Sequence, residues 1–299
     1  MLGKDVTPGE EAIGSTDLIA LTPHDVNSQS PDGVAAPATL GRRVLRFASR
    51  NGLGLVGLAI VGGVWEIIGR FIVTDRLLFA PMSTTMVALY HLLISGAILP
   101  DLRASSEEFA AGYLVAAFLG VGLGALFAAS KFFQRLFSAS VQAGYATPII
   151  ALAPSITVLF GIGLRSKIIV VAAMAVFPIL IGTEGALRAI NPEYVETARA
   201  FGASRAKTLV KVVFPAAAAG VLTGLRLGVG RGIIGAVVAE FFGATQGLGF
   251  LLIQYANAFQ TAKTLSVVVL LAAIGVISNT LLLALERRVA PWSRGSNEE

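Results

Sequence analysis

Two arginines, Arg226 and Arg231, lie inside an otherwise apolar stretch, where a charged side chain is costly unless it has a partner or a function. The chemistry open to them is the attraction of an anion into a pathway through a membrane. The alternative is that each arginine pairs with Glu66, Glu184 or helix-end carbonyls and so locks helices together. Because the arginines are five residues apart, they project from different faces of a helix and need not line one pathway.

The sequence contains no residue set suited to catalysis or to metal binding. It has no cysteine, and its two histidines, His24 and His91, are far apart. No Ser–Lys or Asp–Asp pairing has a credible catalytic spacing, and the phosphate-binding pattern Gly-x4-Gly-Lys-Ser/Thr does not occur. We therefore expect a chain that is not an enzyme, binds no metal or other cofactor and cannot itself hold the phosphates of ATP.

The composition indicates that lipid is the main solvent of this chain. Hydrophobic residues make up 55% of the 299 positions and charged residues only 14%, and the mean hydropathy is +0.76. A soluble domain has closer to a quarter of its residues charged. The sequence predicts an all-α integral membrane protein, and the net charge of +5 is better explained by membrane orientation than by binding to nucleic acid.

Six segments are apolar over about the 20 residues that a helix needs to cross the hydrocarbon core. Residues 83–95 form an amphipathic piece that we expect to lie along the membrane surface. Residues 241–262 are also long enough to cross, but their Gly, Gln and Asn content suits backbone inside protein or beside a water-filled cavity. The six predicted spans are residues 53–73, 109–129, 136–164, 168–190, 216–239 and 264–285.

The basic residues predict the orientation of these spans. With six spans and a cytoplasmic N-terminus, 15 of the 23 Lys and Arg residues lie inside and six outside, which agrees with the positive-inside tendency. Both termini are therefore expected in the cytoplasm. The predicted layout is a disordered tail (1–50), a first span with an interfacial helix (51–101), a transmembrane domain (102–292) and a short C-terminal tail (293–299).

The long cytoplasmic loop, residues 191–215, is predicted to form two short helices at an angle. Pro192 suits a first helical position after an Asn cap, and Gly202 suits the left-handed residue that ends a helix. Ser204 can cap a second helix running to about Val213, before Pro215 marks the start of the next span. Ala198, Phe201 and Leu209 offer small and aromatic contacts, so the loop is suited to a socket on a partner protein.

The spacing in this loop resembles the "EAA" loop of ATP-binding-cassette (ABC) importer permeases, in which Glu-Ala-Ala is followed by a Gly and then by Ile-x-Leu-Pro. Thr197, Val212 and Phe214 differ in size from the family residues, but the spacing is kept. The matching residues are Glu196, Ala198, Gly202, Val212, Phe214 and Pro215. Further stretches, among them Thr223-Gly224-Leu225-Arg226-Leu227, Ala239-Glu240 and Gly247-Leu248-Gly249, resemble the nitrate, sulfonate, taurine and bicarbonate branch.

The resemblance implies a type I ABC importer permease fold in a bacterial inner membrane, with coupling helices at 191–214. It implies three partners: an ATPase dimer that holds ATP and Mg²⁺, a second permease copy, and a periplasmic or lipid-anchored solute-binding protein. The cargo would be a small anion. The chain departs from the branch at Glu108, where an Arg is usual, and at Tyr145-Ala146-Thr147-Pro148, where Arg-Pro-Ile-Pro is frequent.

The remaining expectations concern the pathway and its closure. Arg226, Arg231, Pro148 and Glu240 are the candidates for lining the pathway. Residues 243–260 would form a periplasmic gate with Gly247 and Gly249 as hinges, or else a fixed plug that contacts the binding protein. The alternative function is an ion-coupled secondary transporter, although no convincing inverted repeat is found between residues 53–160 and 165–290.

Overall fold

The structure is a computed structural model that describes residue 54 and residues 56–291, so the predicted tails at 1–50 and 293–299 lie outside the described residues. The chain divides into a unit of residues 1–58 and a unit of residues 59–299. The second unit, as far as it is described, contains helices and no strands. Its elements are η1 (Ile68–Ile72), α2 (Met82–Ile94), α3 (Leu99–Ala129), α4 (Lys131–Ala146), α5 (Ile149–Phe160), α6 (Leu164–Arg188), α7 (Pro192–Ala200), α8 (Arg205–Thr208), η2 (Leu209–Val213), α9 (Phe214–Phe241), α10 (Leu248–Asn257) and α11 (Thr261–Val289).

Four helices of the described chain are long and apolar enough to cross a membrane. They are Leu99–Ala129, Leu164–Arg188, Arg205–Phe241 and Thr261–Val289. They contain the predicted second, fifth and sixth spans, and they cover the predicted fourth span except for its last two residues. The predicted first span is helical from residue 56 and ends in the π-helical turn η1.

The predicted third span is wrong as a single helix. Residues 136–164 fall on α4 and α5, which are bent by 93° at the break between them. Thr147 is extended (φ −66°, ψ 129°) because the following Pro148 disfavours helical backbone in the residue before it. Pro154 and Pro178 lie inside α5 and α6, which continue through them. By length and composition, the described chain therefore has four continuous candidate spans and one bent pair of helices. The predicted number of six membrane spans stays a prediction.

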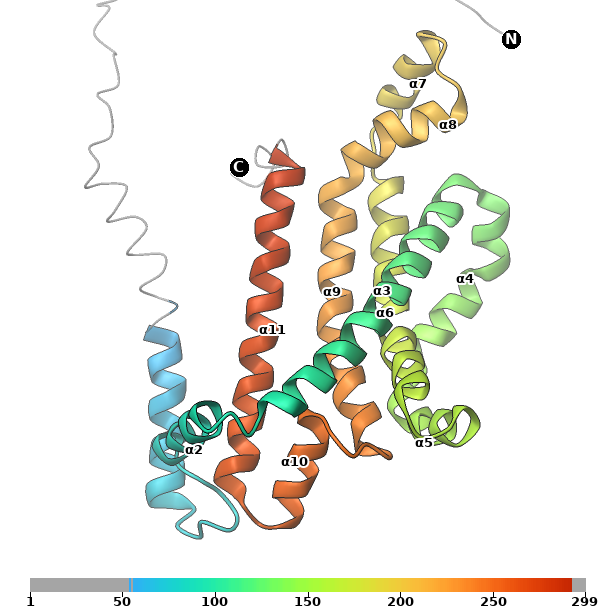
Figure 1. Cartoon of the computed structure of the whole chain (residues 1–299). Coiled ribbons are helices and arrows are strands. Elements are labelled where there is room, and N and C mark those ends of the chain that lie inside the picture. The colour runs from blue at the N-terminus through green and yellow to red at the C-terminus, as the bar shows by residue number, and fades with distance from the viewer. Residues whose placement is uncertain (1–53, 55, 292–299) are drawn as a thin grey trace, which may run out of the picture. The chain divides into compact units, whose positions relative to one another are not determined.

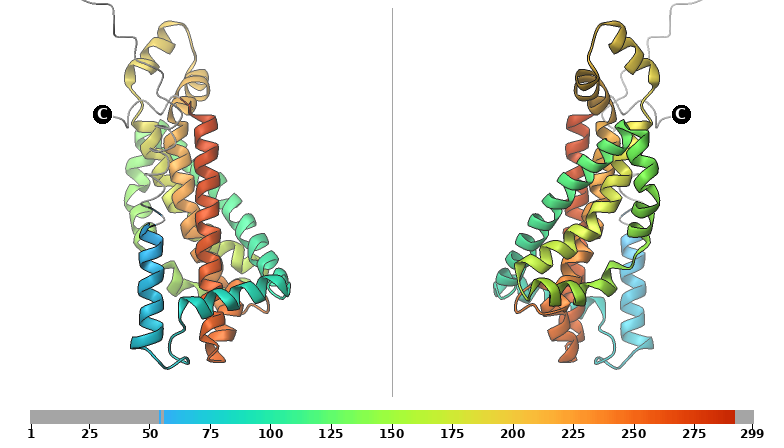
Figure 2. Two further views of the ribbon diagram at one scale, coloured as in Figure 1. Left: turned by 90° about the vertical axis from the view of Figure 1, so that its left-hand side faces the viewer. Right: turned by 90° about the vertical axis from the view of Figure 1, so that its right-hand side faces the viewer.

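The Gly-rich segment 241–262 is confirmed as unsuitable for a single span. Helix α9 ends at Phe241, a loop follows, and α10 has only ten residues before α11 begins at Thr261. The predicted amphipathic piece is also helical, as the 13-residue α2. Both short helices lie at one end of the bundle, and the α7–α8 hairpin extends beyond the other end (Figures 1 and 2). The last turn of α11 lies toward the hairpin end (Figure 1), and the cytoplasmic location of both termini stays a prediction.

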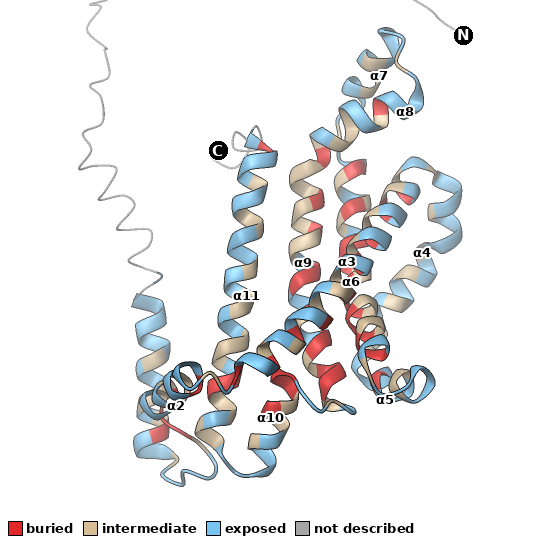
Figure 3. Cartoon of the chain, viewed as in Figure 1, coloured by how far each residue is buried: buried red, intermediate tan, exposed pale blue. Residues whose placement is uncertain are grey.

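The core of the bundle is formed where α3, α6 and α9 pack side by side. Buried positions are concentrated along these helices, whereas α11 is largely exposed (Figure 3). The backbones of α6 and α9 approach closely at Gly182 and Gly224, where a Cβ added to Gly182 would lie 2.6 Å from the Cα of Gly224. Small residues at such contacts are typical of helix packing in membranes, where close van der Waals contact drives association.

Candidate functional site

The loop between α6 and α9 has the helix–turn–helix form that its sequence predicts. Asn191 caps α7 by accepting a hydrogen bond from the backbone N–H of Glu193 at 3.0 Å. Gly202 ends this helix with φ +78°. The N–H of Gly202 donates to the carbonyl of Arg199 at 2.9 Å, and the N–H of Ala203 donates to the carbonyl of Ala198 at 3.0 Å. These two bonds form a Schellman motif, which requires a left-handed residue at position 202.

The second helix of the loop begins as predicted but does not end at Val213. Ser204 caps α8 by accepting from the N–H of Lys207 at 3.4 Å. Helix α8 then runs through the π-helical turn η2 directly into α9, so that residues Arg205–Phe241 form one helical rod of 37 residues. Phe214 and Pro215 directly follow η2 inside this continuous helix. Because Pro215 has no N–H to donate to the preceding turn, the regular α-helical bonding is interrupted at this point, next to the π-helical turn. The loop is therefore joined to a membrane-spanning helix without a flexible connection.

The outer face of the loop exposes apolar side chains. Phe201 is 89% exposed, and Tyr194 and Val210 are also exposed. Glu196 is exposed and forms no ion pair with the described residues, and Ala198 is half-buried. Exposed aromatic side chains on a segment outside the bundle are typical of a protein-binding surface.

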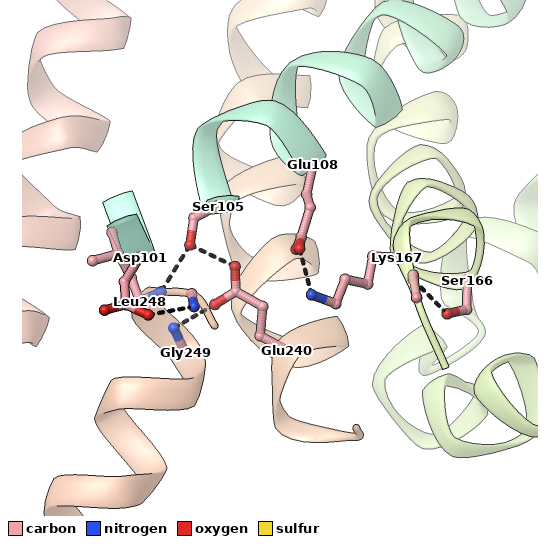
Figure 4. A network of polar contacts seen from close by, with 10 residues as sticks. Asp101, Ser105, Glu108, Ser166, Lys167, Glu240, Leu248 and Gly249 are labelled. Atoms are coloured by element: carbon pink, nitrogen blue, oxygen red, sulfur yellow. Dashed lines mark hydrogen bonds and ion pairs between the residues drawn. The ribbon is translucent and has the colours of Figure 1, made fainter. Parts of the chain in front are cut away.

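A second polar site lies at the opposite end of the bundle and holds the start of α10 (Figure 4). Asp101 of α3 accepts from the N–H of Gly247 at 2.8 Å, and Ser105 of α3 accepts from that of Leu248 at 2.8 Å. Glu240 of α9 accepts from the N–H of Gly249 and from the Ser105 hydroxyl, the latter at 2.5 Å. Side chains of two other helices thus cap α10, and two carboxylates lie at the positive end of its dipole.

This cap was not predicted from the sequence, apart from the naming of Glu240, Gly247 and Gly249. A signal for it exists: Asp101, Ser105 and Glu108 follow one another by four and three residues, which places three polar side chains on one face of α3. Glu108 forms a buried ion pair with Lys167 of α6. Its second oxygen, Oε2, is buried and has no hydrogen-bond partner among the described residues.

The two glycines proposed as gate hinges are packed against the α9 carboxylate. Gly247 has φ +130°, and a Cβ at this position would lie 2.4 Å from Cδ of Glu240. A Cβ at Gly249 would lie 2.6 Å from the carbonyl oxygen of Val237. Both positions therefore need glycine for close approach, which favours the fixed plug over the gate. Movement of this segment during transport stays a prediction.

Replacing Gly247 with alanine is expected to destabilise the protein by about 1–3 kcal/mol, because the new Cβ would strain the backbone and displace Glu240. The thermal unfolding midpoint of the purified protein in detergent is the measurement. Gly230→Ala is the matched control, since Gly230 is an exposed residue of α9 with no atom near an added Cβ. Alanine there is expected to be neutral or slightly stabilising. Equal effects of the two substitutions would contradict the packing argument.

The four candidates for the pathway do not form one group. Arg226 of α9 lies 3.7 Å from Glu286 of α11, so its partner is neither Glu66 nor Glu184. Glu184 instead pairs with Arg188 at 3.2 Å, as its spacing suggests, and Glu66 bonds Arg70. Glu240 is 1% exposed and belongs to the α10 cap.

Arg231 and Pro148 do lie together. Both line a cavity of about 100 Å³ where the α4–α5 break meets α6 and α9. The guanidinium of Arg231 lies over the ring of Tyr145, 5.9 Å from its centroid. The structure therefore brings two of the pathway candidates to the same cavity.

The described chain is an all-helical bundle with four helices long and apolar enough to cross a membrane, and with an exposed helical hairpin at one end. Residues 116–291 match the family model for the binding-protein-dependent transport system inner membrane component, and the chain belongs to this family. It is a multi-pass inner-membrane permease of an ABC importer, and the secondary-transporter alternative is not favoured.

Individual relatives agree with this assignment. The chain is 29% identical over 239 residues to the putative aliphatic sulfonates transport permease protein SsuC of Bacillus subtilis, covering 80% of this chain and 87% of the relative. It is 26% identical over 245 residues to the taurine transport system permease protein TauC of Escherichia coli, covering 80% and 89%. A chain from inward-facing structures of the MetNI methionine ABC transporter shares the fold, with a TM-score of 0.57, 23% identity and coverage of 62% and 93%.

Proposed function

We propose that this permease forms, with a second copy of itself, the pathway for a small organosulfonate delivered by a solute-binding protein. The observation that carries the proposal is the α7–α8 hairpin, which exposes Phe201 and continues without a break into α9. A separate ATPase dimer, which holds ATP and Mg²⁺, binds this hairpin. Support for the sulfonate comes from the relatives named for aliphatic sulfonates and taurine, and from the cationic cavity at Arg231.

The hairpin transmits force because its second helix, α8, is continuous with α9, the helix that carries Arg231. Closure of the ATPase dimer moves α7 and α8, and the rod from Arg205 to Phe241 carries this displacement into the membrane. The close contact of Gly182 with Gly224 couples α9 to α6, so the core helices move as a body. Rocking of two such bodies exposes the cavity to each side of the membrane in turn.

The test is uptake of labelled taurine into proteoliposomes that contain the permease, its ATPase subunit and its solute-binding protein. We expect uptake to require ATP on the side of the ATPase and the binding protein on the other side, and to stop when the phosphate-binding lysine of the ATPase is replaced. Ethanesulfonate and methionine serve as competing solutes of different charge. Uptake driven by an ion gradient without ATP would contradict the importer mechanism, and competition by methionine but not by ethanesulfonate would contradict the sulfonate assignment.

A further inference from the structure

We infer that Arg231, together with Tyr145 and Thr147, forms an anion-binding subsite in the membrane-spanning part of the pathway. The inference rests on the proposed function, because it names the part of the pathway that recognises the charged group of the cargo. Arg231 lies ten residues before the end of α9 at Phe241. It is eight residues before the end of the predicted span 216–239, or about 12 Å at 1.5 Å per residue, so Arg231 lies within the predicted span and nearer its outer end.

Arg231 differs from three other cations of the spanning helices, each of which has a carboxylate partner. Lys167 pairs with Glu108, Arg188 with Glu184, and Arg226 with Glu286. Arg231 is exposed, and no carboxylate of the described chain lies within ion-pair distance of it. An intramembrane cation without a counter-ion is expensive unless it faces water or a ligand, and an anionic ligand supplies the missing charge.

The break between α4 and α5 creates the cavity that receives this ligand. Gly144 lets the end of α4 approach α6, because a Cβ there would lie 2.4 Å from Cζ of Phe177. Pro148 then turns the chain, and the cavity opens between Tyr145, Thr147 and Arg231. Discontinuous helices near the middle of the membrane form the substrate sites of other transporters, since their irregular backbone is tolerated only beside a cavity.

The lining of the cavity indicates the class of ligand. A single guanidinium recognises one monoanionic group, and its planar fork can bond two oxygens of a sulfonate or a carboxylate. The Tyr145 ring and Met174 offer apolar contact for a short carbon chain, and the Thr147 hydroxyl, which donates to the carbonyl of Ala143, can still accept a hydrogen bond. The subsite therefore suits a short organic monoanion and disfavours a dianion.

Charge replacement at position 231 provides the first test. In the taurine uptake assay, Arg231→Gln is expected to lower the initial rate about tenfold to a hundredfold, the effect of losing a hydrogen bond between charged groups. Arg231→Lys keeps the charge and is expected to retain most of the rate. Stimulation of ATP hydrolysis by the binding protein should persist in both, which separates loss of recognition from loss of assembly. Unchanged uptake by Arg231→Gln would overturn the subsite.

The absence of native cysteine permits a second test that does not depend on the cargo. Arg231→Cys is expected to react with the water-soluble trimethylammonium-ethyl methanethiosulfonate reagent, which restores a positive charge, and to regain part of its taurine uptake. The sulfonatoethyl reagent, which adds a negative charge, should react without rescue. Val276→Cys, at an exposed apolar position of α11, is the control and is expected to remain unlabelled. If the thiol introduced by Arg231→Cys does not react, position 231 faces lipid or protein, and the inference is overturned.

The two tests separate failure of the subsite from failure of the proposed function. If the wild-type complex imports taurine and the Gln variant does so equally, the subsite alone is wrong. If the wild-type complex imports no sulfonate, the proposed cargo is wrong, and labelling at position 231 still reports whether this position faces an aqueous pathway.

Discussion

A chain with proline in place of Gly202 is expected to insert into the membrane and to lose ATP-driven uptake to background level. Gly202 has φ +78°, whereas proline fixes φ near −65°, so the turn between α7 and α8 cannot form. Proline also removes the N–H that donates to the carbonyl of Arg199, which is one of the two bonds of the Schellman motif. The hairpin would then present Phe201 in the wrong position to the ATPase. Taurine uptake and substrate-stimulated ATP hydrolysis by the reconstituted complex are the measurements.

The same substitution elsewhere in the chain controls for general damage. Gly96 also has positive φ, +70°, and lies between α2 and α3 at the end of the bundle opposite the hairpin. Gly96→Pro is expected to keep measurable coupled ATP hydrolysis. Glu196→Arg reverses a charge on the same surface. The Glu196 carboxylate is exposed and has no ion pair within the described chain, so it is free to contact the ATPase, and its replacement by arginine is expected to abolish coupling. Full coupled ATP hydrolysis in both loop variants would show that the hairpin is not the ATPase-binding element.

Removal of the Lys167 ammonium is expected to cause the largest loss of stability, about 3–5 kcal/mol in the free energy of unfolding. The side chains of Lys167 and Glu108 are only 11% and 6% exposed. Lys167→Ala would leave a buried carboxylate without its counter-charge, and one oxygen of that carboxylate already has no partner among the described residues. Denaturant unfolding of the purified permease in mixed micelles measures the change.

Two comparisons establish whether this loss comes from the uncompensated charge. The double variant Glu108→Leu/Lys167→Met replaces the pair by apolar side chains and is expected to recover most of the stability. Arg103 and Glu107 form a pair on the same helix at 2.7 Å with side chains 83% and 59% exposed. Arg103→Ala is therefore expected to leave the free energy of unfolding nearly unchanged. A double variant as unstable as Lys167→Ala would contradict the electrostatic explanation.

Local features of the coupling hairpin could be predicted from the sequence because they depend on neighbouring residues. The Asn191 cap, the left-handed Gly202 and the Ser204 cap each involve bonds within five positions, and all three are confirmed in the structure. The family and the all-helical fold are confirmed as well. The coupling role of the hairpin itself stays a prediction until the variants are measured.

The features that were missed depend on how separate helices meet. Hydropathy is averaged over many residues, so the uniformly apolar stretch 136–164 could not predict the 93° bend between α4 and α5. Pro148 lies at the bend, but a proline alone does not give the angle. The partner of Arg226 is Glu286, 60 residues away on α11, and local spacing cannot identify it. Ser105 and Glu240 are separated by 135 positions, so their hydrogen bond follows only from the packing of α3 against α9.

The cap on α10 also has a consequence for synthesis of the chain. Asp101 and Gly247 are 146 positions apart in the sequence. At a synthesis rate of about 5–20 residues per second, Gly247 is added roughly 7–30 s after Asp101. During that interval a nascent chain carries Asp101 and Ser105 without their final partners. A truncated chain that stops before α10 never satisfies them. The hydrogen bonds that fix α10 can therefore form only after the chain has been synthesised as far as Gly249.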